Sequence, residues 1–422
     1  MCAMATVRLK PGKERSLARR HPWVYANAID SVSGAPGNGA LVAVRGADRR
    51  FLAWAAYSPG SMIRARCWSF EESDRIDADW LLSRIDTAVA RRRELQQATN
   101  AVRLVFSEAD ALPGLIVDRY ADYLVTQFQA AGIDGHRELL LDALCRCTAC
   151  VNVFDRSDAA MRAREGLTEL GGVLRGAAPP KHVCVREHEL RYWVDLRHGH
   201  KTGFYIDQRD NRRLVGELVR RLAARLGRAP RVLNCFCYTG GFGIVAAHAG
   251  AETVTSVDSS ADALELARGN AALNGLGVHA LAQDGAGEAP PEASTKVRWE
   301  WICADAFEQL RLLRAEGRRF DLIVLDPPKF ATNQHQVPHA ARAYKDINLS
   351  ALRLLERGGA LLSFSCSGAV GAELFQKIVA GAAIDAGADC YLRARLAAGA
   401  DHPTLLTHPE GEYLKGLLLE RL

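Results

Sequence analysis

The stretch RVLNCFCYTGGFGIVAAHAGAETVTSVD, residues 231–258, decides the fold class of this chain. It passes from a short apolar segment through a glycine-rich turn into a helix-like segment, and then into a second strand that ends at Asp258. Gly240, Gly241 and Gly243 permit a tight turn, and the helix that follows would point amide donors at a bound ligand. The spacing is not G-x-G-x-x-G, and nucleotide, dinucleotide and methyl-donor enzymes all use glycine-rich turns. The stretch therefore predicts a ligand-binding βα junction without identifying the ligand.

Strands continue to alternate with helical segments after this junction. Strand-like runs follow at WEWICAD (299–305), FDLIVLD (320–326) and GALLSFSC (359–366). Such alternation predicts a parallel sheet with right-handed crossovers, so residues 198–422 are expected to form a doubly wound, Rossmann-like α/β domain. Its ligand site should lie at the carboxyl ends of the strands.

Acidic residues stand at these predicted strand ends. Asp258 is placed to accept hydrogen bonds from ribose hydroxyls, and Asp305 is suited to the edge of an adenine. Either residue alone could be a surface or helix-capping side chain. Glycines followed by aspartates at three successive strand ends favour an adenosine pocket.

The predicted strand at 320–326 ends in the sequence DPPK. Pro327 and Pro328 have fixed φ angles and no N–H, so the exit from the strand is rigid and its carbonyls can face a flat polar ring. A Pro-Pro turn can also simply end a strand. Together with the preceding acids, Asp326 and its prolines predict a clamp for a nucleobase beside S-adenosylmethionine.

Cys366, in SFSCSG, ends the next predicted strand. It could be a small buried hydrophobe, as strand-end cysteines often are. It could also be a nucleophile, because methylation of a pyrimidine at carbon 5 requires a thiolate to add to carbon 6. Lys329 is one nearby group that could promote ionisation of the thiol.

The first 70 residues are strongly basic, with eleven Lys or Arg against three acids. This charge predicts a docking surface for a polyanion, although a solvated basic face is the alternative. Short alternating runs separated by SGAPGNG and SPGS predict a small β-rich module at residues 1–72. Its candidate RNA contacts are Lys10, Lys13, Arg15, Arg19 and Arg20, and its aromatic residues Trp23, Tyr25, Trp54 and Tyr57 are candidates for either base stacking or the core.

Residues 73–197 are expected to form a mixed α+β middle domain that begins with a helix from about Asp77. A helix is expected at about 136–147, and the Gly- and Pro-rich ELGGVLRGAAPP interrupts the domain. The cysteines of CRCTAC have metal-like spacing but no second pair nearby, so no metal is expected. The chain shows no secretion signal and no long apolar run, which predicts a cytoplasmic protein with reduced thiols and no membrane association. Asp284 to Lys296 is expected to be a surface loop.

These motifs together resemble the class I S-adenosylmethionine-dependent RNA methyltransferases with an N-terminal PUA domain, in particular the cytosine-C5 methyltransferases of large-subunit ribosomal RNA. The resemblance spans almost the whole chain. The motifs that carry it are LKPGKERSLARRHPWVY, EADALPGLIVDRY, GHKTGFYIDQRDNR, NCFCYTGGFG, LDPPKFA, YKDINL, SFSCSG and PEGEYLKGL.

The resemblance implies ribosomal RNA as partner, S-adenosylmethionine as cofactor and, in many members, a homodimer. It implies that Cys366 is the nucleophile and that Asp326 hydrogen-bonds the cytosine ring. The cofactor contacts that it implies are Asn234, Phe236, Tyr238, Thr239, Gly240, Gly241, Asp258, Asp305, Ala306, Asp326 and Pro327. The segment from Lys201 to Arg209 would pack over cofactor and base, with Lys201, Phe204, Gln208, Arg209 and Lys329 as substrate contacts.

The sequence leaves three alternatives open. A sister group of guanine-N7 methyltransferases shares KTGFYIDQRDNR and the DPP turn but lacks Ser-Cys-Ser, because a ring nitrogen needs no covalent activation. An NAD-dependent oxidoreductase fits Asp258 but not GGFG or DPPK, and a non-catalytic RNA-binding assembly factor fits the basic N-terminus. Asp401 and His402 resemble a motif near the active site of the family, so they are candidates for removal of the carbon 5 proton or for a structural role.

Overall fold

The computed structural model describes residues 4–277 and 297–422, so the loop expected at 284–296 lies outside the described residues. The chain divides into two compact units. The N-terminal unit comprises Met1–His188, Val194–Ile206 and Asp401–Gly411, and the C-terminal unit comprises Glu189–Trp193, Asp207–Ala400 and Glu412–Leu422. Within the described ranges, no helix combines the length and the apolar character needed to cross a bilayer.

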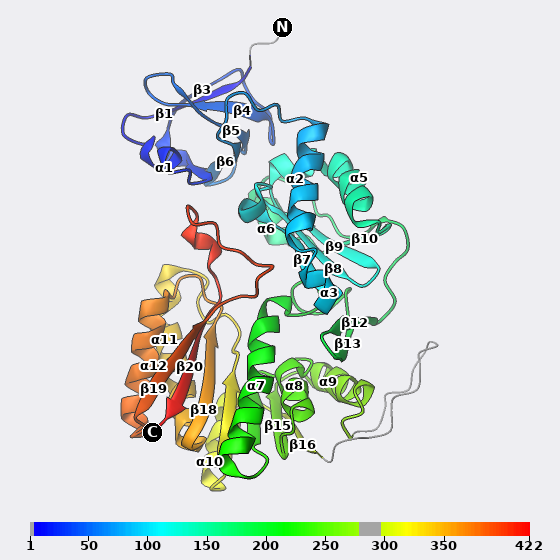
Figure 1. Ribbon diagram of the computed structural model, residues 1–422. Helices are drawn as coiled ribbons and strands as arrows, with labels where there is room; N and C mark the ends of the chain where they lie inside the picture. Colours follow the sequence, from blue (N-terminus) through cyan, green and yellow to red (C-terminus); the bar gives the residue numbers. More distant parts are fainter. Residues whose placement is uncertain (1–3, 278–296) are drawn as a thin grey trace. The chain divides into compact units, whose positions relative to one another are not determined.

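The N-terminal unit begins with a six-stranded sheet in the order β2-β6-β5-β4-β1-β3 (Figure 1). Alternate residues such as Val7, Leu9, Val42 and Val44 are fully buried, as expected for strands with one face on a core. This confirms the β-rich module. Its elements are β1 (Thr6–Leu9), α1 (Arg15–Ala18), β2 (Trp23–Tyr25), β3 (Ile29–Ser33), β4 (Leu41–Arg45), β5 (Phe51–Tyr57) and β6 (Ile63–Ser69).

A second sheet in the same unit has the strand order β11-β10-β9-β8-β7. One of its strands, β11, falls inside the Gly- and Pro-rich segment that was expected only to interrupt the domain. The strands are β7 (Ala101–Phe106), β8 (Leu115–Tyr120), β9 (Tyr123–Phe128), β10 (Asn152–Asp155) and β11 (Gly172–Arg175), and the helices are α2 (Ala78–Arg91), α3 (Leu95–Ala98), α4 (Ala131–Gly135), α5 (Arg137–Thr148) and α6 (Ala159–Arg164). The strands β12 (Val183–Glu187) and β13 (Leu190–Val194) follow.

The cysteines of CRCTAC lie on and just after α5. The Cys150 thiol donates to the Asp122 carbonyl at 2.9 Å, and burial raises the pKa of Cys145, Cys147 and Cys150. Thiols with raised pKa are poor metal ligands, because the thiolate is the ligand form. No group of His, Cys, Asp or Glu in the described part of the chain could hold a metal ion.

The C-terminal unit is built on a seven-stranded sheet in the order β16-β15-β14-β17-β18-β20-β19. The five strands from β16 to β18 are mutually parallel, which confirms the predicted doubly wound arrangement. The prediction did not include β20, which runs antiparallel to β18, or β19, which runs antiparallel to β20. The strands are β14 (Arg231–Cys235), β15 (Thr253–Asp258), β16 (Arg298–Cys303), β17 (Phe320–Leu325), β18 (Leu355–Ser365), β19 (Cys390–Leu396) and β20 (Lys415–Arg421).

Helices cover both faces of this sheet (Figure 1). α8 packs against α7 and α9, while α11 packs against α10 and α12. The chain reverses its winding direction between β14 and β17, which are hydrogen-bonded neighbours, and such a switch point is where α/β sheets bind ligands. The helices are α7 (Arg209–Leu226), α8 (Gly241–His248), α9 (Ala261–Leu273), α10 (Ala306–Ala315), α11 (Val337–Leu354) and α12 (Ala372–Ala386).

Candidate active site

The loop after β14 has an unusual backbone. Phe236, Tyr238 and Gly240 all have positive φ angles, of 58°, 49° and 84°. Non-glycine residues with positive φ are strained and are common at functional sites. The Asp258 carboxylate holds this loop, because its Oδ2 accepts a hydrogen bond from the Tyr238 N–H at 2.8 Å. The two strand ends that the sequence predicted to share a ligand are therefore in direct contact.

Buried polar atoms around this loop lack hydrogen-bond partners. Neither side-chain amide atom of Asn234 has a partner among the described residues, and the same holds for the Thr239 hydroxyl. Both residues are buried, with exposed fractions of 0% and 3%. Leaving such atoms unpaired costs about 1–3 kcal/mol each, so they fit a site that a polar ligand completes.

The glycines of the turn are closely packed, so a side chain there would have to displace its neighbours. A Cβ added at Gly241 would lie 3.0 Å from Cδ of Arg212, and one at Gly243 would lie 3.1 Å from Val254. Gly240 precedes α8 in the left-handed conformation, which a side chain would strain. The turn thus brings bare backbone and the start of α8 to the switch point.

Asp305 has a role that its position alone did not reveal. It is exposed, and its Oδ1 accepts hydrogen bonds from the N–H groups of Phe307 at 2.9 Å and Glu308 at 3.1 Å. It is therefore the N-cap of α10, and the next residue, Ala306, is buried. The helix-capping alternative is observed here, and any ligand contact of Asp305 comes in addition to it.

Asp326 lies just beyond β17 and receives a hydrogen bond at its Oδ2 from Gln208 Nε2 at 3.0 Å. Gln208 is itself buried and oriented, because its Oε1 accepts from Asn211 Nδ2 at 2.6 Å. Two residues predicted for the site, 118 positions apart, thus meet. Pro327 is buried after Asp326, whereas Lys329 is exposed.

Cys366 follows the end of β18, the strand next to β17. Its Sγ lies 3.8 Å from the carbonyl oxygen of Pro327, so the thiol faces the DPPK segment. The sheet register explains this, because Leu325 of β17 pairs with Ser363 of β18. The prediction placed Cys366 beside the nucleobase clamp, and the two segments do lie together.

The serines on either side of Cys366 are buried and hydrogen-bonded. Ser365 Oγ donates to the Tyr344 hydroxyl at 2.9 Å, and that hydroxyl shares a 3.0 Å hydrogen bond with Ser367 Oγ. Ser367 Oγ also accepts from the N–H groups of Phe330 and Ala331, at 3.1 and 3.2 Å. One tyrosine of α11 therefore ties the cysteine loop to the segment that follows Asp326.

A buried lysine approaches the same loop. Lys415, the first residue of β20, is 6% exposed, and its Nζ donates to the Ser367 carbonyl at 2.9 Å. Neither Tyr344 nor Lys415 was assigned a role from the sequence. Both lie in motifs that carry the family resemblance, YKDINL and PEGEYLKGL. Membership of these motifs is the sequence signal that could have singled them out.

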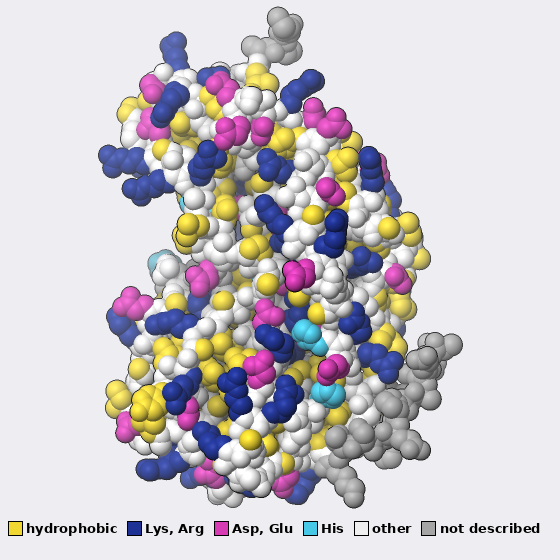
Figure 2. Space-filling model, viewed as in Figure 1, with side chains coloured by type: hydrophobic (Ala, Val, Ile, Leu, Met, Phe, Trp, Pro, Cys, Tyr) yellow, Lys and Arg dark blue, Asp and Glu magenta, His cyan; other side chains and the backbone are white. Residues whose placement is uncertain are grey.

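The remaining predicted residues divide between the units. Lys201 and Phe204 belong to the N-terminal unit, whereas Gln208 and Arg209 belong to the C-terminal unit. Phe204 and Arg209 are buried, and the Lys201 ammonium lies 4.4 Å from the centre of the Tyr205 ring. The basic residues Lys10, Lys13, Arg15, Arg19 and Arg20 are all exposed. Figure 2 shows Lys and Arg side chains protruding from the surface that surrounds α1 in Figure 1.

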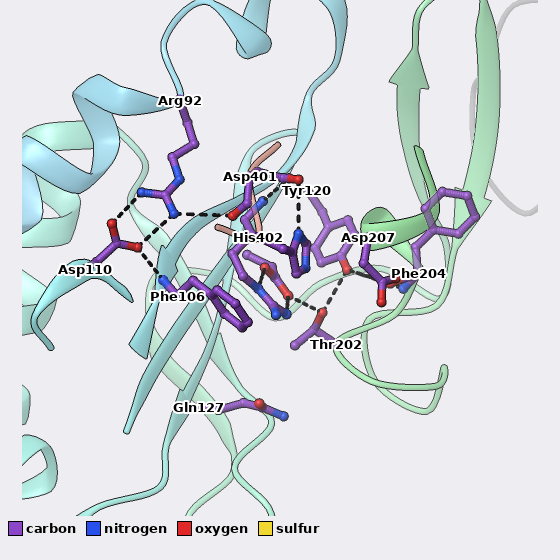
Figure 3. A network of polar contacts seen from close by, with 12 residues as sticks. Arg92, Phe106, Asp110, Tyr120, Gln127, Thr202, Phe204, Asp207, Asp401 and His402 are labelled. Carbon is purple, nitrogen blue, oxygen red and sulfur yellow. Dashed lines mark hydrogen bonds and ion pairs between the residues drawn. The ribbon is translucent and has the colours of Figure 1, made fainter. Parts of the chain in front are cut away.

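Asp401 and His402 anchor the chain within the N-terminal unit (Figure 3). Asp401 accepts from the Arg103 N–H at 2.9 Å and from His402 Nδ1 at 3.0 Å, and its carbonyl accepts from Arg92. Arg92 also forms two hydrogen bonds with Asp110, of 2.7 and 2.8 Å. These buried contacts describe a structural anchor and favour the structural alternative for this pair.

Comparisons with known proteins agree with this geometry. Residues 7–70 match the PUA-like domain family, and residues 173–404 match the S-adenosylmethionine-dependent methyltransferase family. The predicted cofactor, S-adenosylmethionine, is thereby confirmed. Among the described residues, Asn234 and Thr239, whose side chains lack partners there, the glycine turn and Asp258 have the chemistry to fit this cofactor.

Similar structures and relatives cover nearly the whole chain. A methyltransferase structure from Streptococcus mutans has a TM-score of 0.79 at 17% identity, covering 99% of this chain and all of its own. A methyltransferase structure in complex with S-adenosylhomocysteine has a TM-score of 0.80 with the same identity and coverage. At this identity the likeness shows the shared fold.

Curated relatives are much closer in sequence. The ribosomal RNA large subunit methyltransferase I of Tolumonas auensis is 45% identical over 99% of both chains. The protein of the same name from Aeromonas salmonicida is 45% identical over 97% of this chain and 98% of its own, and that from Vibrio cholerae is 43% identical over 97% of both. The chain therefore belongs to the family of S-adenosylmethionine-dependent methyltransferases called ribosomal RNA large subunit methyltransferase I.

Proposed function

We propose that this protein methylates carbon 5 of a cytosine in large-subunit ribosomal RNA through a covalent adduct with Cys366. The RNA class is that named for the relatives, and the PUA-like domain with its basic residues supports it. The observation that carries the choice of base is the position of the Cys366 thiol, 3.8 Å from the Pro327 carbonyl in the DPPK segment.

The chemistry of carbon 5 explains the need for a thiol. When bound, S-adenosylmethionine supplies an electrophilic methyl group on a sulfonium sulfur. Addition of the Cys366 thiolate to carbon 6 moves an electron pair toward carbon 5, which becomes nucleophilic. After methylation, loss of the carbon 5 proton and expulsion of the thiolate restore the aromatic ring and the free enzyme.

Asp326 would assist this addition. Asp326 directly precedes Pro327, whose carbonyl lies 3.8 Å from the Cys366 sulfur, and Gln208 fixes the orientation of the Asp326 carboxylate through the 3.0 Å hydrogen bond. A carboxyl group there can hydrogen-bond the polar edge of the cytosine and favour protonation of the ring as the thiolate adds. Pro327 and Pro328 keep this segment rigid.

The test compares Cys366→Ser with Cys303→Ser. Cys303 is an exposed cysteine at the end of β16 in the same sheet, so it controls for loss of a strand-end thiol. We expect wild type and Cys303→Ser to form 5-methylcytidine in ribosomal RNA, detected by nucleoside mass spectrometry. Cys366→Ser should form none while still binding S-adenosylmethionine.

A second measurement examines the adduct itself. RNA that carries 5-fluorocytosine should remain attached to the wild-type protein, because carbon 5 then has no proton to lose. A methylated guanine as product, or full turnover by Cys366→Ser, would exclude the covalent cytosine mechanism and favour methylation of a ring nitrogen.

A further inference from the structure

Lys415 is a buried cation next to the proposed nucleophile. Its side chain is 6% exposed, and buried lysines are rare unless their charge has a purpose or a partner. The antiparallel register pairs Lys415 with Ser365, the last residue of β18 and the one directly before Cys366. From there Nζ reaches over to the Ser367 carbonyl at 2.9 Å, which fixes the ammonium beside the Cys366 backbone.

A neutral carbonyl cannot balance this charge. Burial lowers the pKa of Lys415, because removal from water disfavours the charged ammonium. Of its charged neighbours, Cys366 and Glu412 favour the ammonium, whereas Lys329 disfavours it. Among the described groups that act on Lys415, Cys366 and Glu412 can supply a negative charge, and Cys366 does so only as a thiolate.

We infer that Lys415 is the positioning residue that holds Cys366 as a thiolate before the RNA base arrives. The thiol proton leaves to solvent, and the resulting anion is paired with the fixed ammonium. The inference rests on the proposed function. A buried cation beside Cys366 is needed only if Cys366 attacks the base as a thiolate.

The other groups around the cysteine are less suited to this task. Asp326, on the loop after β17, and Glu412, in the segment before β20, are acids and oppose a second negative charge. Tyr344, on α11, has its pKa raised by burial and is therefore a neutral phenol. Lys329 is cationic but exposed, so solvent and salt screen its charge.

The experiment measures the pH dependence of Cys366 alkylation by iodoacetamide in the full chain without RNA. The Cys366 peptide is quantified by mass spectrometry, which separates it from the other cysteines. Lys415→Met should move the alkylation midpoint upward by at least about one pH unit, since a nearby opposite charge shifts a pKa by about that amount or more. Lys415→Arg should keep the midpoint near that of wild type.

Lys345→Met is the matched control, because Lys345 lies on α11 of the same unit and its ammonium pairs with Asp385 of α12 at 2.8 Å. It should leave the midpoint unchanged. In turnover, Lys415→Met should lower kcat more than it changes KM for RNA, and raising the pH should restore part of kcat. An unchanged alkylation midpoint in folded Lys415→Met would overturn the inference.

A direct measurement covers the case in which Lys415→Met does not fold. The ultraviolet absorbance of thiolate, compared between wild type and Cys366→Ser, reports ionisation of Cys366 at neutral pH. Its presence supports the inference and its absence overturns it. The two proposals fail differently: an active Cys366→Ser defeats the covalent mechanism, whereas an inactive Cys366→Ser with a normal midpoint in Lys415→Met defeats only the role of Lys415.

Discussion

At the scale of single residues, the sequence SFSCSG is a framework for one thiol. The two serine side chains point into the core and share the Tyr344 hydroxyl, so their neighbour Cys366 is held where the DPPK segment passes. Ser367 also accepts two N–H groups from that segment. The three residues therefore act together: the two serines position the loop, and the cysteine between them faces the site.

Tyr344→Phe tests this framework. Removing the hydroxyl leaves Ser365 and Ser367 without their shared partner in a buried place, which should cost about 1–3 kcal/mol of unfolding free energy. The cysteine loop should also lose its link to α11, so we expect kcat for methyl transfer to fall. Urea unfolding and steady-state kinetics measure the two effects.

The exposed tyrosine of β19 provides the control for Tyr344→Phe. Tyr391 is 52% exposed, so Tyr391→Phe should alter neither stability nor turnover. Wild-type kcat in a Tyr344→Phe protein of reduced stability would show that the hydroxyl serves packing alone.

The residue chemistry was only partly accessible from the sequence. Cys366 and Asp326 could be singled out because their residue types and strand-end positions carry a chemical meaning. Tyr344 and Lys415 could not, because a helix residue and the first residue of β20 acquire their roles through contacts between segments 23 to 48 positions apart. Asp305 shows the reverse case, in which a suggestive position proved to hold a helix cap.

At the scale of elements, the parallel strands were predictable and their antiparallel neighbours were not. β17, FDLIVL, is buried at every residue, and such apolar runs between helices indicate a parallel sheet. β20, KGLLLER, contains a run of three leucines between charged residues, but nothing within it fixes its direction. That direction depends on pairing with β18, which is a long-range contact.

An ion-pair cluster lies at the amino ends of the central strands, whereas the site lies at their carboxyl ends. Asp321 of β17 accepts hydrogen bonds from Arg228 Nη2 at 2.7 Å and from the Arg231 N–H of β14 at 2.8 Å. Burial by itself raises the pKa of Asp321, but the hydrogen bonds from Arg228 and Arg231 outweigh it and bring the pKa below its usual value. The carboxylate thus joins the two central strands where they begin.

Asp321→Asn should therefore weaken the sheet in a pH-dependent way. The stabilisation by a carboxylate of lowered pKa is present above the unfolded pKa of about 3.9 and is lost as the pH falls through the folded value. At neutral pH we expect a loss of about 1–3 kcal/mol, with the difference from wild type shrinking in acid. Urea midpoints from neutral pH down to about pH 3 measure it. A difference that is constant over this range would contradict the electrostatic role.

At the scale of the whole molecule, the chain does not divide simply along its length. The segment Asp401–Gly411 returns to the N-terminal unit, and Glu189–Trp193 belongs to the C-terminal one. The prediction of three consecutive domains at 1–72, 73–197 and 198–422 could not include these exchanges, because composition changes mark boundaries along the sequence only. We retain the three-domain division as a proposal, since the N-terminal unit contains two separate sheets.

The charge of the molecule is concentrated at its N-terminal end, and this asymmetry leads to a prediction about RNA binding. Arg15, Arg19 and Arg20 are exposed on and after α1, and Arg20 alone among them pairs with an acid in the described structure, Glu71 at 3.1 Å. Exposed arginines that contact phosphates release counterions, so they set the salt dependence of affinity. Replacing all three with Gln should weaken RNA binding and reduce the slope of log affinity against log salt by about 2.

The control for this triple variant replaces three exposed arginines of the C-terminal unit, Arg221, Arg268 and Arg314, with Gln. It removes the same net charge. A loss of RNA affinity that came only from the lower net charge of the protein would therefore appear equally in both variants. Docking through α1 predicts a reduced slope in the first variant and a wild-type slope in the second, measured by filter binding across a salt series. Equal slopes in all three proteins would place the RNA contacts elsewhere, because a phosphate contact cannot be lost without a change in counterion release.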